Sequence, residues 1–198
     1  MSNPRKSTLS VQYLTRIAIL GALASILFMI EIPVIAFYKL DLSTIPVLLG
    51  AFSMGPLPGM AILLIKDMTG MLHSTSGFVG ELADFIMSAA YVLPAAVIYR
   101  MCKSRKGALT GMIVGTLLMI VVAVLVNWKI MIPFYMGAFH KTLDEIVGMA
   151  QNALPFVDTE LKLLLCVTAP FNVLKGVVLS VVTYLIYKPL SPMLKVRK

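Results

Sequence analysis

The sequence predicts an all-α integral membrane protein, a bundle of six transmembrane helices with both termini on the cytoplasmic side. Of the 198 residues, 59% are hydrophobic and only 13% are charged, which is about half the charged fraction of a soluble domain. Mean hydropathy is +0.93, and short basic segments flank the apolar runs. The excess apolar surface must therefore face lipid, and residues 1–198 are expected to form one membrane domain.

The apolar runs define six expected spans, at residues 13–36, 44–55, 57–72, 81–99, 108–132 and 163–187. The first run is too long for the hydrophobic region of a cleaved signal peptide and lacks a small-residue cleavage site. It should therefore remain in the protein as the first span.

The second and third spans are expected to form a short hairpin. They are halves of one apolar stretch, residues 43–72, which a Gly-Pro-Leu-Pro-Gly segment interrupts at 55–59. Two prolines between glycines break a helix. Each half is then roughly 18–24 Å long, which is short for a hydrocarbon core of about 30 Å. Neighbouring helices or a thinned bilayer would have to shield such helices.

The basic residues select this hairpin over a single kinked span. Eleven of the 17 lysines and arginines lie in three short flanks, and such flanks stay in the cytoplasm. A kinked span would place two of the three flanks outside, whereas the hairpin places all of them inside. Because the net charge of +8 is concentrated in these flanks, a nucleic-acid binder is excluded. The flanking cations are Arg5, Lys6, Arg16, Arg100, Lys103, Arg105, Lys106, Lys188, Lys195, Arg197 and Lys198.

With this orientation the external loops are residues 37–43, 73–80 and 133–162. The last contains a polar stretch, 137–162, that predicts a loop with a short amphipathic helix. Enzyme signatures for ATP binding, metalloproteases and serine hydrolases are missing from the sequence. The two cysteines and two histidines have no metal-ligand spacing. The sequence therefore predicts neither catalytic residues, nor a metal site, nor a bound cofactor.

Polar side chains inside the spans are the candidates for a binding site, because a charge at the bilayer centre costs about 2.5–3.5 kcal/mol or more. Glu81 and Asp84 are three residues apart and share a helix face, as do Asn172 and Lys175. Structural roles remain open for all of them, such as dipole stabilisation by Glu81 or an ion pair of Lys175 with Asp84 or Glu81. The other polar side chains in spans are Lys66, Asp67 and Asn127; adjacent Lys66 and Asp67 are expected to point to different sides in a structural role.

Small residues at four-residue spacing indicate close helix packing. Ala18 and Ala22 form such a pair on the first span, and Gly107, Gly111 and Gly115 continue the pattern on the fifth. These stripes could serve packing within the chain or docking of a partner helix.

Four runs carry a family resemblance: YKLDLSTIPVLLGAF at 38–52, GPLPG at 55–59, GELADF at 80–85 and PFNVLKG at 170–176. Together they resemble the riboflavin-specific S component of energy-coupling factor (ECF) vitamin transporters. The similarity covers nearly the whole chain and is weakest at 133–162.

The resemblance implies a bacterial cell-membrane subunit without enzymatic activity that captures riboflavin at the extracellular side. Such subunits dock on a membrane T component driven by two cytoplasmic ATPases, and Ala18 and Ala22 match the family's docking motif. The implied ligand-binding residues are Tyr38, Lys39, Leu40, Asp41, Glu81, Asp84, Asn127, Asn172 and Lys175.

Riboflavin is uncharged, with a flat apolar ring system, a polar ring edge and a hydroxylated chain, so an apolar slot with a few hydrogen-bonding groups suits it. Flavin mononucleotide also remains open, because cations in the outer half could accept its phosphate. Two alternative functions remain open besides riboflavin capture. One is an S component for another vitamin or a queuosine-like precursor, and the other is an intramembrane enzyme using Glu81, Asp84 and Lys175 as acid–base groups.

Overall fold

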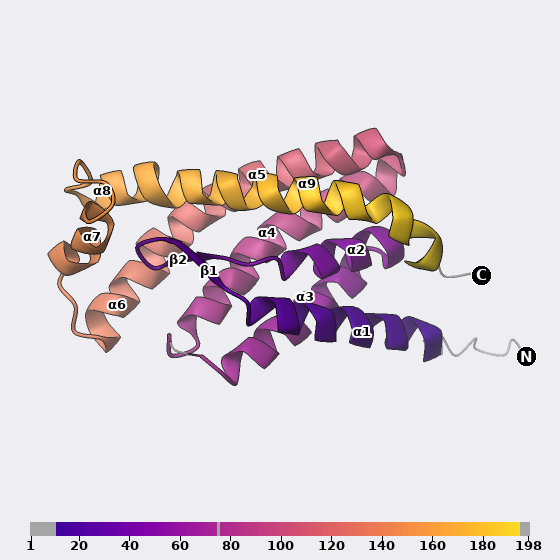
Figure 1. The fold of residues 1–198 in the computed structure, drawn as a ribbon, viewed down its shortest axis with the longest axis horizontal. Coiled ribbons are helices and arrows are strands. Elements are labelled where there is room, and N and C mark those ends of the chain that lie inside the picture. Colours follow the sequence, from indigo (N-terminus) through magenta and orange to yellow (C-terminus); the bar gives the residue numbers. More distant parts are fainter. Residues whose placement is uncertain (1–10, 75, 195–198) are drawn as a thin grey trace, which may run out of the picture.

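The computed structural model describes residues 11–74 and 76–194, with side chains up to residue 187. The flanking cations Arg5, Lys6, Lys195, Arg197 and Lys198 lie outside the described residues. The described part is a bundle of long helices with one two-stranded antiparallel ribbon (Figure 1). Its elements are α1 (Val11–Phe28), β1 (Ile32–Ile35), β2 (Tyr38–Leu40), α2 (Thr44–Met54), α3 (Pro56–Met71), α4 (Val79–Cys102), α5 (Arg105–Val126), the π-helical turn η1 (Asn127–Met131), α6 (Ile132–Ala138), α7 (Leu143–Gln151), α8 (Glu160–Leu163), the π-helical turn η2 (Leu164–Thr168) and α9 (Ala169–Leu194).

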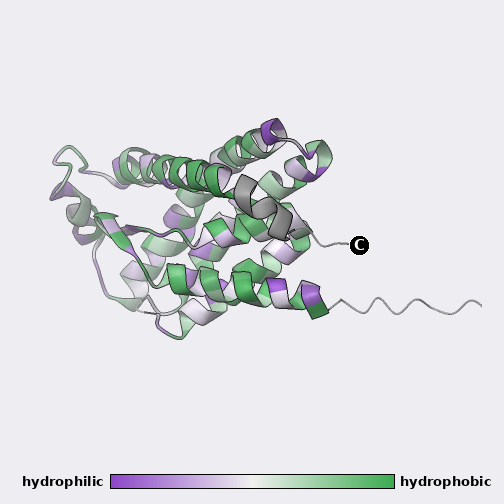
Figure 2. Ribbon diagram, turned by 45° about the vertical axis from the view of Figure 1, so that its right-hand side comes forward, coloured by the Kyte–Doolittle hydropathy of each residue, from purple (hydrophilic) through white to green (hydrophobic). Residues whose placement is uncertain are grey.

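Four helical stretches in the described residues are long and apolar enough to cross a membrane. α1 begins and α9 ends at one end of the bundle, while the ribbon, α6, α7 and α8 lie toward the other (Figure 1). The long helices are mainly hydrophobic along their length (Figure 2). The four stretches are Val11–Phe28, Val79–Cys102, Arg105–Ala138 and Glu160–Tyr187.

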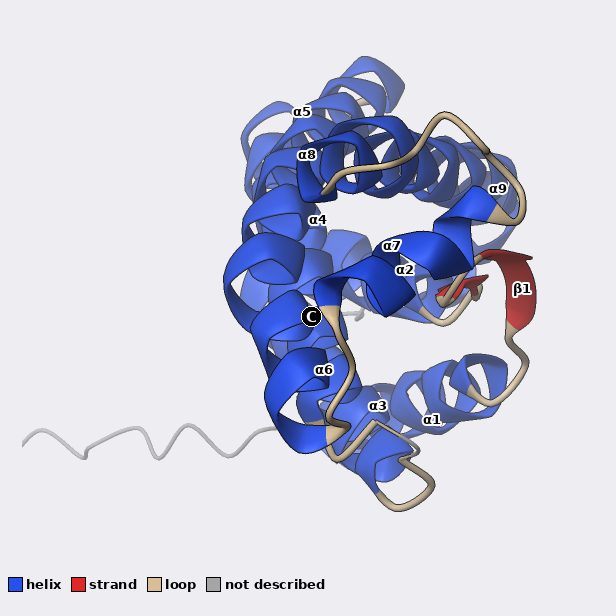
Figure 3. Ribbon diagram, turned by 90° about the vertical axis from the view of Figure 1, so that its left-hand side faces the viewer, coloured by secondary structure: helices blue, strands red, loops and turns tan. Residues whose placement is uncertain are grey.

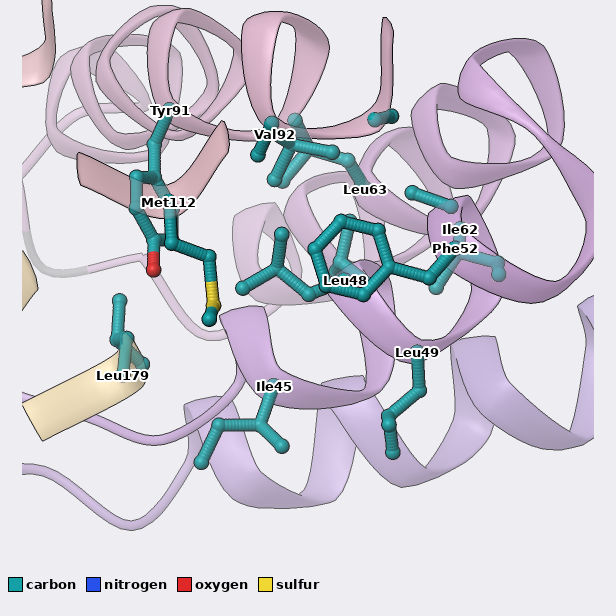
Figure 4. Close-up of a cluster of buried hydrophobic side chains, with 14 of the residues drawn as sticks. Ile45, Leu48, Leu49, Phe52, Ile62, Leu63, Tyr91, Val92, Met112 and Leu179 are labelled. Atoms are coloured by element: carbon teal, nitrogen blue, oxygen red, sulfur yellow. The ribbon is translucent and has the colours of Figure 1, made fainter. Parts of the chain in front are cut away.

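The short helix α2 lies in the middle of the bundle, behind α7 in the end-on view (Figure 3). Every residue from Thr44 to Phe52 is buried, and α1, α3, α4 and α9 all contact this helix. A helix that is apolar on all sides belongs in a core, and Ile45, Leu48, Leu49 and Phe52 form the middle of that core (Figure 4). Neighbouring helices therefore shield α2.

α2 and α3 are separate helices joined at Gly55. Gly55 has a φ of 112°, a backbone conformation that glycine adopts without a Cβ clash. Pro56 follows at the first turn of α3, where its missing N–H is harmless. The Gly-Pro-Leu-Pro-Gly segment thus ends one helix and begins the next.

The glycine stripe on α5 packs inside the chain. A Cβ placed on Gly111 would lie 2.7 Å from the carbonyl oxygen of Ala95 on α4, and Gly115 abuts the carbonyl of Tyr91 in the same way. Only glycine lets the two backbones approach this closely. Of the two roles left open for this stripe, the structure therefore supports internal packing.

The expected first span, 13–36, extends beyond the end of helix α1. The helix ends at Phe28, and residues 32–40 form the ribbon, with Ile32 opposite Leu40 and Pro33 opposite Lys39. Pro33 disfavours helix for the preceding residue, and β-branched neighbours favour extended backbone. The apolar run therefore contains a helix and a strand.

The predicted amphipathic helix in the polar stretch is confirmed as α7. Thr142 and Glu145 form a capping box at its start, in which each side chain accepts a hydrogen bond from the other residue's backbone N–H. Ile146, Val147 and Ala150 are buried against a second apolar cluster that includes Tyr38 and Phe171. This contact brings α7 against the end of the bundle that carries the ribbon.

Candidate ligand-binding cavity

A cavity of about 270 Å³ lies beside the ribbon, between α4, the α5–η1 segment and α9. Eight of the nine predicted ligand-binding residues line it, although they come from distant parts of the chain. The exception is Leu40, which is half-buried in β2 and packs against the apolar cluster around Tyr38. The eight are Tyr38, Lys39, Asp41, Glu81, Asp84, Asn127, Asn172 and Lys175.

The walls combine apolar surface with convergent polar groups. Aromatic rings and methionine side chains supply the apolar part, and the volume is close to the lower end of the range for small-molecule sites, about 300–1,000 Å³. Such a cavity suits a flat apolar molecule with a hydrogen-bonding edge. Besides Tyr38 and Ala83, the apolar and aromatic lining residues are Phe28, Phe37, Met87, Met119, Met131, Tyr135 and Phe171.

Tyr38 connects the ribbon to the helix bundle through hydrogen bonds of its hydroxyl group. Its hydroxyl donates to Asn127 Oδ1 at 3.2 Å and is hydrogen-bonded to the Thr168 hydroxyl. Asn127 begins η1 and Thr168 ends η2, so the two π-helical turns meet at this point. Such turns are often found at functional sites. Burial raises the pKa of Tyr38, which the Thr168 hydrogen bond opposes, and the phenol remains a neutral donor.

Asn127 therefore acts mainly as a support. Its Oδ1 accepts from Tyr38, and its Nδ2 donates to the Ala123 carbonyl at 2.8 Å. Asn172 differs, because its Nδ2 donates to the Thr168 carbonyl at 2.8 Å and its Oδ1 accepts from no group among residues 11–74 and 76–194. Asn172 lines the cavity, so its Oδ1 is the amide oxygen best placed to accept from a ligand.

A buried ionic network forms the polar end of the cavity. Lys175 Nζ lies 2.9 Å from Asp84 Oδ1 and 3.1 Å from Asp41 Oδ2. Of the two partners left open for Lys175, Asp84 or Glu81, the structure pairs it with Asp84, and Asp41 is a second partner. Asp41 also accepts hydrogen bonds from the Ser43 N–H, at 2.9 Å, and from the Ser43 hydroxyl.

Lys66 completes the network from α3 and was missed as a site residue. Its ammonium, 0% exposed, pairs with Asp84 and lies 2.8 Å from Asp67 Oδ1. The expectation that Lys66 and Asp67 point to different sides is therefore wrong. Lys66 also lies 4.4 Å from the ring centroid of Phe28, a cavity-wall residue. Because a lysine this deep must find an acidic partner, its position in an apolar span was the available signal.

Three further charged residues line the cavity, namely Glu81, Lys39 and Glu31. Glu81 Oε2 accepts from the hydroxyls of Ser74 and Ser76, at 2.8 and 3.1 Å. Glu81 lies in the first turn of α4, so its expected role at the helix dipole is compatible with its position. Lys39 Nζ lies 2.5 Å from Glu31 Oε2, and both residues are exposed.

The structure contains no candidate metal-binding cluster among residues 11–74 and 76–194. No group of three or more His, Cys, Asp or Glu side chains there could hold an ion. Both cysteines are free and exposed.

Comparison with known proteins gives one consistent result. A family model described as "ECF transporter, substrate-specific component" matches residues 12–187. The riboflavin transporter RibU of Staphylococcus aureus is 31% identical over 185 residues, which cover 92% of either chain. The riboflavin transporter FmnP of Bacillus subtilis is 27% identical over 190 residues, covering 93% of this chain and 94% of that protein.

A solved structure gives the same result in three dimensions. The S component of a bacterial ECF transporter superposes with a TM-score of 0.71 at 30% identity, covering 93% of this chain and 98% of that chain.

Proposed function

The chain belongs to the family of substrate-specific components of ECF transporters, and from this membership we propose that it is the riboflavin-binding subunit of such a transporter. The cavity carries the proposal, because it combines aromatic and methionine walls with Asn172 and Lys175 at a polar end. The riboflavin transporters named above, which resemble this chain over nearly their whole length, support the choice of vitamin.

In the proposed binding mode the flavin ring lies between the apolar walls. Asn172 Oδ1 accepts from the imide N–H of the ring, and Lys175 donates to a ring carbonyl. The ribityl hydroxyls donate to the carboxylates of Glu81 and Asp84. Tyr38, Asn127 and Leu40 hold the ribbon against the bundle, while Asp41 orients Lys175 and Lys39 lies at the entrance.

The proposed topology has six spans, α1, α2, α3, α4, α5 with its continuation into α6, and α8 to α9, in a single membrane domain. Both termini face the cytoplasm, and the cavity opens to the outside. The antiparallel course of the helices and the flanking cations support this orientation (Figure 1). The localisation is then the bacterial cell membrane.

Transport requires partners in this proposal. The sequence has no GxxxxGK[ST] segment, so ATP hydrolysis is assigned to two cytoplasmic ATPases, coupled through a membrane T component. Ala18 and Ala22 are exposed on α1, whereas Leu20, Gly21, Ala24 and Ser25 of the same helix are buried. Because Ala18 and Ala22 face away from the bundle, they are available as the docking surface.

The topology predicts which cysteines react from outside the cell. Cys102, at the end of α4, should be inaccessible to a membrane-impermeant maleimide in intact cells of a Cys166→Ser variant. A cysteine at Asn152, exposed after α7, should react in a Cys102→Ser/Cys166→Ser background. Labelling is measured by the mass shift of the protein, and open cells serve as the control for reactivity. Reaction of both positions from outside would contradict the hairpin assignment.

The proposed function is tested by titrating the purified protein with riboflavin and following the quenching of flavin fluorescence. We expect saturable binding with a Kd below about 1 μM, which corresponds to about −8.2 kcal/mol. The ligand should be recovered unchanged. Absence of binding, or stronger competition by a different vitamin, would overturn the riboflavin assignment, and a modified product would favour the intramembrane enzyme.

A further inference from the structure

A second cavity lies at the end of the bundle where α1 begins and α9 ends, away from the ribbon (Figure 1). Its volume is about 160 Å³, and its walls come from α2, the start of α5 and the second half of α9. Phe52, Ala108 and Met112 supply apolar surface, and Arg105 is the one charged lining residue in the described part of the chain. The cavity is therefore an apolar pocket with a cation at the start of α5.

The cavity is open toward the surface that faces lipid. Tyr184 and Leu185 line it and are 42% and 66% exposed. Both belong to a helical stretch that is long and apolar enough to cross a membrane, so their exposed surface contacts hydrocarbon. A lipid chain can therefore enter the cavity from the bilayer.

The inner wall is held in shape without a ligand. The Tyr187 hydroxyl is hydrogen-bonded to the Tyr99 hydroxyl at 2.5 Å, and the Phe52 ring packs edge-on against the Tyr187 ring, with centroids 5.6 Å apart. Thr183 also lines the cavity and is buried, and its hydroxyl has no hydrogen-bond partner among the described residues. A buried hydroxyl without a partner is unfavourable, so a bound molecule with an acceptor oxygen would satisfy it.

The charge at this end of the bundle is positive and uncompensated. Arg105 is exposed and forms no hydrogen bond or ion pair with any other residue that the structure describes. Arg100, Lys103 and Lys106 lie within five residues of it and are also exposed. Segment 85–143, which contains all four cations, has no aspartate or glutamate. The guanidinium of Arg105 is therefore available to an anion.

We propose that this cavity is a binding site for an anionic phospholipid. One acyl chain lies along Phe52 and Met112, the phosphate lies on the Arg105 guanidinium, and a glycerol ester carbonyl accepts from the Thr183 hydroxyl. Arg105 suits this task because its planar fork can bond two phosphate oxygens at once. In the proposed orientation this end faces the cytoplasm, where basic pockets between membrane helices bind anionic head groups. The inference does not depend on which vitamin the chain binds.

A lipid fits the cavity better than a helix of a partner protein does. A helix with its side chains is about 10–12 Å across, which is too wide for a cavity of this volume, whereas an acyl chain is a single row of methylene groups. The charge adds selectivity, because one basic residue near the membrane surface favours an anionic lipid by about fivefold, equivalent to about 1 kcal/mol. A free anion lacks the chain that the apolar walls would bind.

The test places a fluorescent reporter in the cavity. Trp128 is the only tryptophan of the chain, so Tyr184→Trp in a Trp128→Phe background gives a single indole there. The variant is reconstituted into vesicles of equal parts phosphatidylglycerol and phosphatidylcholine, in which one lipid or the other carries brominated chains that quench tryptophan on contact. The surface charge is the same in both preparations. Contact with phosphatidylglycerol should be at least about threefold more frequent.

Further variants separate a site from general attraction to a basic protein. Leu117→Trp in the same background places the indole on the lipid-facing side of α5, at a position 60% exposed, and should show nearly equal quenching by the two lipids. Arg105→Gln added to the Tyr184→Trp reporter should abolish the preference. Lys106→Gln removes an exposed charge that does not line the cavity and should keep the preference. Leu185→Trp, at the other exposed lining position, is a second reporter and should give the same result as Tyr184→Trp.

Equal quenching by the two lipids at both cavity reporters, or a preference that persists in Arg105→Gln, would overturn the inference. An equal preference at Leu117→Trp would also overturn it, because anionic lipid would then surround the whole protein. Loss of the preference on adding inorganic phosphate, but not sodium chloride of the same ionic strength, would assign the cavity to a free anion instead.

Discussion

Asn172→Ala should weaken riboflavin binding by about 5- to 150-fold while the protein remains folded. The alanine removes the amide oxygen that we assign to the flavin imide N–H. Leaving that donor buried without a partner costs about 1–3 kcal/mol. Asn172 lies in α9, 2% exposed, on the turn before Lys175, so water cannot easily replace the lost oxygen.

The measurement separates a binding role from a structural one. The Asn172 amide also donates to the Thr168 carbonyl at 2.8 Å, so a small loss of stability is expected with or without ligand. A binding role requires that the increase in Tm on adding riboflavin shrinks as well. Asn152→Ala, at an exposed position after α7, is the matched control. An unchanged riboflavin Kd in Asn172→Ala would remove this residue from the site.

The polar part of the cavity was largely predictable, since charged and amide groups in a span are too costly to be accidental. That argument identified Glu81, Asp84, Asn172 and Lys175, and the family resemblance added the segment from Tyr38 to Asp41. The polar argument left Asp84 and Glu81 both open as partners of Lys175, because partners depend on how helices are rotated against one another. Asp41 is thus an unforeseen second carboxylate for Lys175.

Two residues that contact the cavity-lining residues were not predicted, for different reasons. Lys66 was assigned a structural role because it and the adjacent Asp67 were expected to point to different sides, yet its contact with Asp84 joins α3 to the cavity. Thr168 gave no signal, since a threonine in an apolar helix is usually satisfied by its own backbone. Its contact with Tyr38 arises at the end of η2, and a π-helical turn changes the helical period too locally for a hydrophobic pattern to reveal it.

The fold was predictable where hydrophobicity and helix breakers agree, and not where they conflict. Four of the five residues in segment 55–59 are glycine or proline, so the separation of α2 from α3 follows from it. Residues 32–35 are as apolar as the helix before them, and a hydropathy argument extends the helix through them. Only Pro33 and its β-branched neighbours indicate the ribbon, and its pairing with residues 38–40 is a contact between segments.

Ala18→Trp should reduce riboflavin uptake by about tenfold or more while leaving riboflavin binding within about twofold. Ala18 and Ala22 are exposed on the side of α1 that faces away from the bundle, so an indole there creates no clash within the chain. A partner helix that packs closely against small residues would meet the indole. Overpacking costs typically 1–3 kcal/mol, and about 1.4 kcal/mol is a factor of ten.

Uptake is measured with labelled riboflavin in cells that also produce the T component and both ATPases, and binding is measured on the purified variant. Leu117→Trp is the matched control, because Leu117 is 60% exposed on α5 and an indole there should face lipid. If both variants lose uptake equally, tryptophan on the surface is harmful in itself. If Ala18→Trp loses binding together with uptake, α1 supports the cavity through this face, and the docking surface must lie elsewhere on the bundle.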